Sequence, residues 1–152
     1  MRDLAPRARF DALARLLQLD ELALDAIRGS INALLPNLGE LAAMWDDTLR
    51  SQHAKPVFGP MDADLRESLH SRLASFIFRT IGCVFDDDYC DYAESFAREK
   101  DVPPFLIGVA LSVAYEFVAR NLADKVEDKN RLAESLAAWN RLITALREFA
   151  NT

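Results

Sequence analysis

The chain has 152 residues, of which 51% are hydrophobic, and its 24 acidic and 18 basic residues give a formal net charge of −6. This length and hydrophobic content fit one compact domain over residues 1–152 whose core needs neither a metal nor disulfides. The interspersed charges form no basic footprint for a phosphate backbone, so we expect no nucleic-acid partner.

Apolar residues return along the chain at spacings of three and four, and sustained alternation between hairpin turns is absent. This pattern predicts an all-α protein. The N-terminus has no basic region followed by an apolar stretch, so we expect no signal peptide and a cytoplasmic location. The most apolar run, residues 105–119, is shorter than the roughly 20 residues of a membrane span. We expect it to be a buried core helix, with no membrane partner.

The first part of the chain predicts helices separated by polar and proline-containing breaks. A short helix is expected over about residues 7–18, and Asp20 is a candidate N-cap for the next helix. Pro36 removes a backbone donor, so residues 20–51 predict either two helices or one bent helix. Residues 51–60 contain two prolines and a glycine and predict the clearest loop.

Aspartates mark the starts of the next two predicted helices. Asp62 or Asp64 is expected to cap a long helix that ends near Cys83. The aspartates at 86–88 are expected to begin a helix that runs to about Lys100, because carboxylates favour the positive end of a helix dipole.

A rigid break then separates this helix from the C-terminal part of the chain. Val102-Pro103-Pro104 interrupts the helical pattern and also suits the first turn of a new helix. Two long helices with apolar faces are expected over residues 105–126 and 130–151.

No sequence motif indicates catalysis: a nucleophile elbow, a P-loop and an HExxH pair are all absent. We therefore expect no enzyme, while a triad whose members meet only in three dimensions stays open as an alternative. His53 lies in the predicted loop, and His70 falls off the apolar stripe of its helix, so both are expected at the surface.

Two further clusters have simple structural interpretations. Glu94, Glu99 and Asp101 are expected to form a solvated face, because no Glu-x-x-His pair accompanies them and a metal site is therefore not indicated. Cys83 and Cys90 are expected to be buried free thiols, with a redox switch as the alternative.

Two stretches carry a resemblance to a known family. They are FIFRTIGCVFDDDY over residues 76–89, similar to an E-to-F helix corner, and VPPFLIG over residues 102–108, similar to the start of a G helix. On these stretches and the helix order, the chain resembles the sensor globins: the globin domains of globin-coupled sensors and, closest in character, the non-haem globin domains of R-type stressosome proteins. The resemblance covers about residues 10–150. It implies a globin-like fold with helices A/B, E, F, G and H and an extra short N-terminal helix.

The resemblance also shows a departure from haem-binding members. Their axial histidine on the F helix falls here on Phe96, and no histidine follows His70 in the chain. Phenylalanine has no donor atom for iron, so we expect no haem and no other cofactor. The B-helix tyrosine of the family corresponds to Trp45, which occupies volume that a porphyrin needs. We expect aromatic and aliphatic side chains to line or fill a vestigial haem pocket: Trp45, Phe58, Leu69, Leu73, Phe76, Ile77 and Phe96.

The resemblance implies a signalling role for the chain. We expect a haem-free sensory input domain that forms a homodimer through its C-terminal helices and relays a signal to an output domain or protein partner. The expected interface is the apolar stripe of the last helix, which core packing explains equally well: Leu132, Leu136, Trp139, Leu142 and Leu146. Two alternatives stay open, namely a small apolar ligand in the pocket, and a haem-based gas sensor with Cys90 or His70 as an unorthodox ligand.

Overall fold

Helices account for 78% of the chain and strands are absent, as a computed structural model of residues 1–152 shows. Seven helices have 11 or more residues, and one short helix and one 3-10 turn, η1, connect them. The α-helices are α1 (Pro6–Leu16), α2 (Glu21–Leu34), α3 (Leu38–Arg50), α4 (Ala54–Phe58), α5 (Ala63–Ile81), α6 (Asp87–Arg98), α7 (Leu106–Lys125) and α8 (Lys129–Ala150), and η1 is Leu35–Asn37. The all-α prediction is confirmed.

Aspartate side chains begin four of these helices. Asp20 accepts the backbone N–H of Ala23 at 3.0 Å, Asp62 caps α5, and Asp86 caps α6. The caps at Asp20 and Asp62 were predicted, the latter with Asp64 as the alternative. Asp86 was expected only to lie at the start of its helix, and Asp128, which caps α8, was not predicted. Each cap satisfies a backbone donor that the first helical turn leaves without an internal partner.

The two proline-containing breaks act differently. Pro36 lies in η1, so the segment predicted as two helices or one bent helix is two helices, α2 and α3. Pro103 and Pro104 lie before α7, which begins at Leu106. The expectation that these prolines also form the first turn of this helix was therefore wrong. The predicted loop at residues 51–60 also contains a helix, α4, of five residues.

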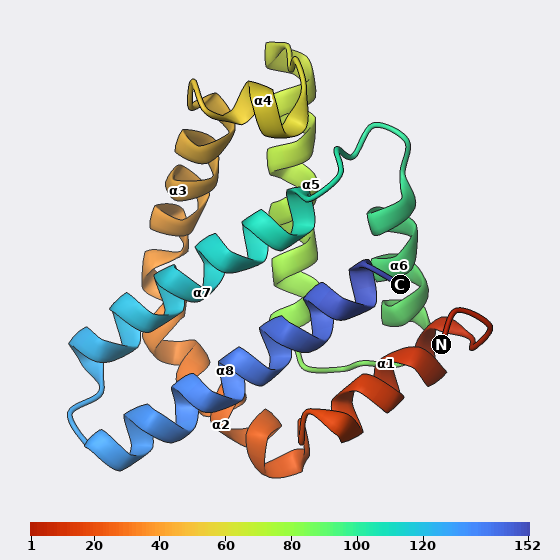
Figure 1. The fold of residues 1–152 in the computed structure, drawn as a ribbon. Coiled ribbons are helices and arrows are strands. Elements are labelled where there is room, and N and C mark those ends of the chain that lie inside the picture. The colour runs from red at the N-terminus through yellow and green to blue at the C-terminus, as the bar shows by residue number, and fades with distance from the viewer.

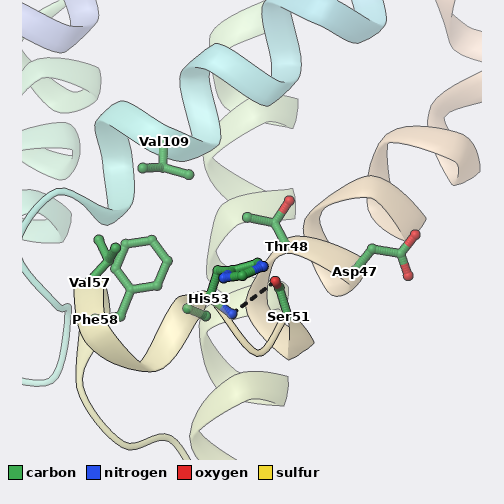
Figure 2. Close-up of a pocket in the computed structure, with 8 residues that line it drawn as sticks. Asp47, Thr48, Ser51, His53, Val57, Phe58 and Val109 are labelled. Atoms are coloured by element: carbon green, nitrogen blue, oxygen red, sulfur yellow. Dashed lines mark hydrogen bonds between the residues drawn. The ribbon is translucent and has the colours of Figure 1, made fainter.

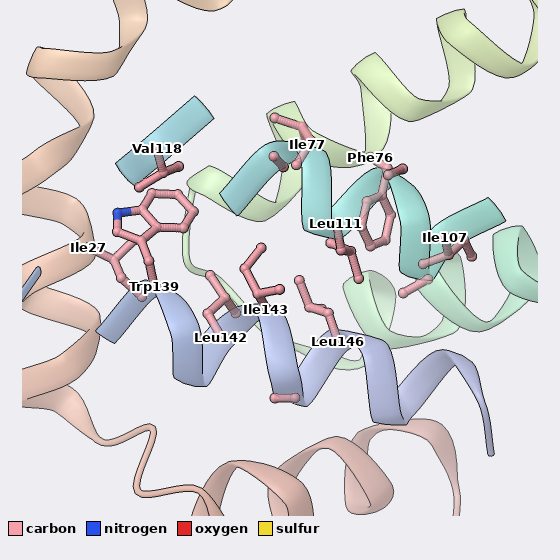
Figure 3. Packing of buried hydrophobic residues seen from close by; sticks show 14 of the residues in the cluster. Ile27, Phe76, Ile77, Ile107, Leu111, Val118, Trp139, Leu142, Ile143 and Leu146 are labelled. Atoms are coloured by element: carbon pink, nitrogen blue, oxygen red, sulfur yellow. The ribbon is translucent and has the colours of Figure 1, made fainter. Parts of the chain in front are cut away.

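α7 and α8 run antiparallel, side by side across the molecule (Figure 1). α8 also packs on α1 and α2, while α3 lies against α5 and α7. α7 is long and apolar enough to cross a membrane by length and composition, and 44% of its most apolar stretch is buried within the fold. Figure 3 shows Val118 of α7 beside Trp139 of α8, and Leu111 of α7 on the side of Ile143 and Leu146.

A second, smaller hydrophobic cluster lies apart from the main core. Leu49 of α3, Leu69 of α5 and Leu106 of α7 are its buried members. Phe58 of α4 packs against them. The end of the molecule that carries α4 therefore has its own small core.

A buried ion pair joins α1 to α6. The Arg9 side chain is only 3% exposed and its guanidinium pairs with the carboxylate of Glu94. The same guanidinium lies 5.0 Å from the centre of the Phe149 ring of α8, in a cation–π contact. Its Nε has no hydrogen-bond partner, so the buried charge depends on Glu94 for compensation.

Replacing Glu94 by Gln should therefore destabilise the fold. We expect the free energy of unfolding, measured by urea denaturation, to fall by about 3 kcal/mol, because a buried guanidinium loses its counter-charge. Glu116→Gln is the matched control, since Glu116 forms an exposed i,i+4 pair with Arg120. We expect that control to cost less than about 0.5 kcal/mol. Equal stability of the two variants would contradict the proposed role of the Arg9 pair.

Phe105, the residue before α7, has an unusual backbone conformation. Its φ is +70° and its ψ is −8°, and the N–H of Leu106 donates to the Pro103 carbonyl at 3.2 Å. These values match the third position of a type II turn, which favours glycine. The ring is also 74% exposed, so burial does not offset the backbone strain.

Phe105→Gly should stabilise the protein by about 1 kcal/mol, because the left-handed conformation costs a residue with a Cβ roughly that amount. Phe78→Gly is the control, since Phe78 is exposed but lies within α5. Within a helix, glycine should lower the free energy of unfolding by about 1 kcal/mol. Thermal or urea unfolding of both variants measures the difference, and destabilisation by both would rule out strain at Phe105.

Candidate functional site

The residues expected to line a haem pocket are mostly inside the main core. Trp45, Leu73, Phe76, Ile77 and Phe96 are all buried in that cluster. The structure places the other two elsewhere: Leu69 belongs to the small cluster under α4, and Phe58 is half-buried beside it. Five of the seven residues thus belong to the main core and two to the smaller cluster, while a common pocket among them stays a prediction.

Aromatic side chains fill the space between α5 and α6. The ring centres of Phe76 and Phe96 are 5.5 Å apart in a stacked arrangement. Tyr89 and Tyr92 of α6 each lie 6.4 Å from Phe76. Tyr89 also shares a buried hydrogen bond of 2.6 Å with Thr80 of α5. Neither tyrosine was among the residues expected to line the pocket, although their spacing in a helix that also contains Phe96 was a usable signal.

The polar atoms nearest this region already have partners. The indole N–H of Trp45 donates to the carbonyl of Ala110 in α7 at 3.0 Å, so it is not free for a bound gas molecule. His70 Nε2 lies 3.1 Å from the carbonyl of Ala42 in α3, and its side chain is half-buried. His70 thus ties α5 to α3 at the rim of the helical assembly.

A small hollow next to the main core has an entirely apolar lining. It has a volume of about 20 Å³ and lies among α2, α3, α5, α7 and α8. That volume is about what one water molecule needs, and the walls offer it no polar partner. An apolar organic ligand at this position would require the surrounding side chains to move apart.

The apolar stripe of α8 faces the core of its own chain. Trp139, Leu142 and Leu146 are 3%, 0% and 2% exposed, and Figure 3 shows Leu142 and Leu146 directed toward α7. Trp139 also donates its indole N–H to Ser30 of α2 at 2.8 Å. Leu132 and Leu136 are half-buried. A second copy can therefore reach only these two of the five residues expected at a dimer interface.

A larger pocket opens on the surface where α3, α4 and α7 meet. Its volume is about 420 Å³, which is within the range of small-molecule sites. Figure 2 shows Phe58 and Val109 on one side, Thr48 and Ser51 on the other, and His53 between them. The complete lining is Asp47, Thr48, Ser51, His53, Ala54, Val57, Phe58 and Val109.

Hydrogen bonds leave part of the polar wall available to a ligand. The Ser51 hydroxyl accepts the backbone N–H of His53 at 3.1 Å, so its own proton is free to donate. Thr48 donates to the Met44 carbonyl at 2.9 Å and keeps lone pairs on its oxygen. His53 was expected only as a surface histidine, because the pocket unites residues far apart in the chain and its link to α7 is not visible in the sequence.

The three acidic residues considered as a cluster form two separate structures. Glu94 pairs with Arg9, whereas Glu99 and Asp101 both bind Arg72 of α5. The hydrogen bond from Arg72 lowers the pKa of the Asp101 carboxyl below its ordinary value. No group of three or more His, Cys, Asp or Glu side chains has the arrangement of a metal site.

Both cysteines are free and buried, as the sequence predicts. Burial raises the pKa of the Cys83 thiol, and burial likewise raises the pKa of the Cys90 thiol to about 11. A raised pKa lowers the fraction of thiolate, which is the reactive form, near neutral pH.

A thiol-specific disulfide reagent should therefore react slowly with the folded protein at pH 8. In urea both thiols should react at the rate of a free cysteine, since unfolding removes the burial that raises their pKa. The measurement is the absorbance of the released chromophore over time. Rapid reaction of either cysteine in the native protein would contradict the buried-thiol interpretation and favour a redox role.

Comparison with known proteins finds no match for this chain among family models, curated proteins or solved structures. The interpretation of both the filled interior and the surface pocket therefore rests on their own geometry.

Proposed function

We propose that this chain is a haem-free, globin-like signalling domain that recognises its partners through its surface and has no catalytic role of its own. The observation that carries the proposal is the aromatic contact between α5 and α6. Phe96 occupies the position that the family resemblance assigns to the axial histidine, and it stacks directly on Phe76. No space for a porphyrin separates the two rings.

The helix arrangement supports the globin-like part of the proposal. Globins pack eight helices around a central pocket, and this chain has eight α-helices, one of them only five residues long. The two long C-terminal helices pack on each other and on α2. In this arrangement, α5 and α6 flank the position where the pocket is expected.

Hemin titration tests the haem-free part. We expect no sharp Soret band at one equivalent, either for the natural chain or for Phe96→His, which restores an imidazole at the expected axial position. The physical reason is that aromatic packing, and not only the missing ligand, excludes the porphyrin. A haem-binding globin titrated in parallel provides the positive control.

A Soret band from the natural chain and a Soret band from Phe96→His alone would lead to different conclusions. A sharp band from the natural chain would overturn the haem-free proposal and favour Cys90 or His70 as an unorthodox ligand. A band from Phe96→His alone would leave the natural chain haem-free but would contradict packing as the cause.

Self-association is supported by the resemblance alone. None of the large hydrophobic side chains exposed at the surface belongs to α8, so an interface on this helix would use the half-buried Leu132 and Leu136. In this proposal a dimer conveys the signal to an output module or partner.

Light scattering at protein concentrations up to several hundred micromolar tests the dimer. We expect a dimer mass for the natural chain and a monomer mass when Leu132 and Leu136 are both changed to Glu. Leu22→Glu, at a residue that is 81% exposed on α2, is the control and should stay dimeric. A natural chain that is monomeric throughout would refute the dimer and leave the hemin result unaffected.

A further inference from the structure

A second surface pocket lies where α2 meets the segment that joins α7 to α8. Its volume is about 530 Å³, which is within the range of small-molecule sites. Apart from Ala33 and Val126, its lining consists of glycine and polar residues, so a polar ligand fits it better than an apolar one. We call it the loop pocket, and its complete lining is Gly29, Ser30, Asn32, Ala33, Lys125, Val126, Glu127, Asp128, Arg131 and Ser135.

The Ser135 hydroxyl in the loop pocket has no hydrogen-bond partner within the chain, although the residue is only 5% exposed. Thr48 and Thr80 donate to the carbonyl four residues before them, and Ser135 does not. The Ser135 oxygen is still open to the pocket, because the only fully buried side-chain nitrogen or oxygen without a partner is Nε of Arg9. A nearly buried hydroxyl needs a partner, which here has to come from outside the chain.

Two of the four charged side chains in the loop pocket are held by the chain itself. The Lys125 ammonium donates to the Ala33 carbonyl of α2 at 2.6 Å. The Asp128 carboxylate caps α8 and accepts the backbone N–H of Asn130 at 2.9 Å and that of Arg131 at 3.2 Å. These hydrogen bonds fix the walls of the pocket.

The other two charged side chains, Glu127 and Arg131, have no counter-ion. Neither takes part in any ion pair of the chain, including one with the other. Arg131 lies four residues before Ser135, so the guanidinium and the hydroxyl share one face of α8. Two donors on one face suit a carboxylate, and the carboxylate of Glu127 suits an ammonium group.

We propose that the loop pocket binds a small zwitterion of the α-amino acid class. Arg131 and Ser135 bind its carboxylate, and Glu127 binds its ammonium group. Asn32, on the α2 wall, offers an amide to a polar side chain of the ligand. A simple anion or a simple cation would leave one of the two protein charges without a partner. This inference goes beyond the proposed signalling role, and the hemin result does not bear on it.

Titration with L-glutamine, followed by ¹H–¹⁵N correlation spectra at constant ionic strength, tests the proposal. We expect saturable shifts of the backbone amides over residues 125–131. The indole N–H of Trp139 should also shift, because it donates at 2.8 Å to Ser30, which lines the pocket. The indole N–H of Trp45 donates to Ala110, which is not part of this pocket, and should not shift. A ligand of this size in an open site should have a Kd on the order of 1 mM.

Two analogues of this probe each lack one charge. L-glutaminamide keeps the ammonium group but has no carboxylate, and N-acetyl-L-glutamine keeps the carboxylate but has no ammonium group. Each analogue should bind about 3-fold more weakly than L-glutamine, which is the effect of losing one exposed ion pair.

Two variants assign each ligand charge to its residue. Arg131→Gln should weaken the binding of L-glutamine about 3-fold and remove its advantage over L-glutaminamide. Glu127→Gln should have the same effect on L-glutamine and remove its advantage over N-acetyl-L-glutamine. Glu134→Gln is the matched control, because Glu134 is exposed on α8 and lies outside the pocket, and it should leave all three affinities unchanged.

A third variant, Ser135→Ala, tests the hydroxyl. It should weaken the binding of L-glutamine about 5-fold through the loss of one hydrogen bond. The free energy of unfolding should not fall, because this hydroxyl has no partner within the chain. Ser95→Ala, at an exposed residue of α6, is the control and should leave the affinity unchanged.

Three results would overturn the proposal. They are the absence of saturable shifts at the loop pocket, equal affinities for L-glutamine and both analogues, and unchanged binding by Ser135→Ala. The second would show that the pocket recognises the side chain of the probe and not its two charges.

Discussion

The direct contact between α5 and α6 determines what the interior of this protein can do. Phe76 stacks on Phe96, and Tyr89 and Tyr92 extend the same aromatic layer along α6. Each such aromatic pair stabilises the fold by about 0.5–1.5 kcal/mol in addition to its hydrophobic burial. Separating α5 from α6 would lose several of these pairs at once. The apolar hollow among α2, α3, α5, α7 and α8 is close to the size of one water molecule. The interior between these helices is therefore packed core.

α6 is held in position from its other side by α1. Packing between α1 and α6 is more extensive than between α5 and α6, and the buried pair of Arg9 and Glu94 lies within it. Phe10 of α1 also packs at 4.8 Å from Phe85, just before α6. A buried ion pair is costly when broken but gains little over apolar packing, so we infer that this pair acts mainly to fix one orientation of α6. That orientation brings Phe96 onto Phe76.

The sequence predicted the helices well because their boundaries depend on local chemistry. Asp20, Asp62 and Asp86 are caps, and Pro36 divides α2 from α3. The element that packs against an apolar helix face, however, cannot be read from the residues of that helix. The periodicity that includes Trp139 fits a dimer interface and a core equally, and only the positions of α2 and α7 show that this residue faces inward. The surface pocket was missed for the same reason, since its walls come from three separate helices. The strained turn was missed because turn preferences assign glycine to that position.

The surface pocket is also connected physically to the core. Val109 lines the pocket, and the carbonyl of the next residue, Ala110, accepts the hydrogen bond of the buried Trp45 indole. A ligand that displaced this part of α7 would lengthen that bond, and a buried indole N–H without a partner is costly. The pocket lies over the small cluster of Leu49, Leu69 and Leu106 rather than over the main core. Regions with few buried contacts open more readily than the centre of a fold, so this end can respond to a ligand while the rest stays packed. The pocket wall and the buried hydrogen bond of Trp45 therefore involve adjacent residues of the same turn of α7.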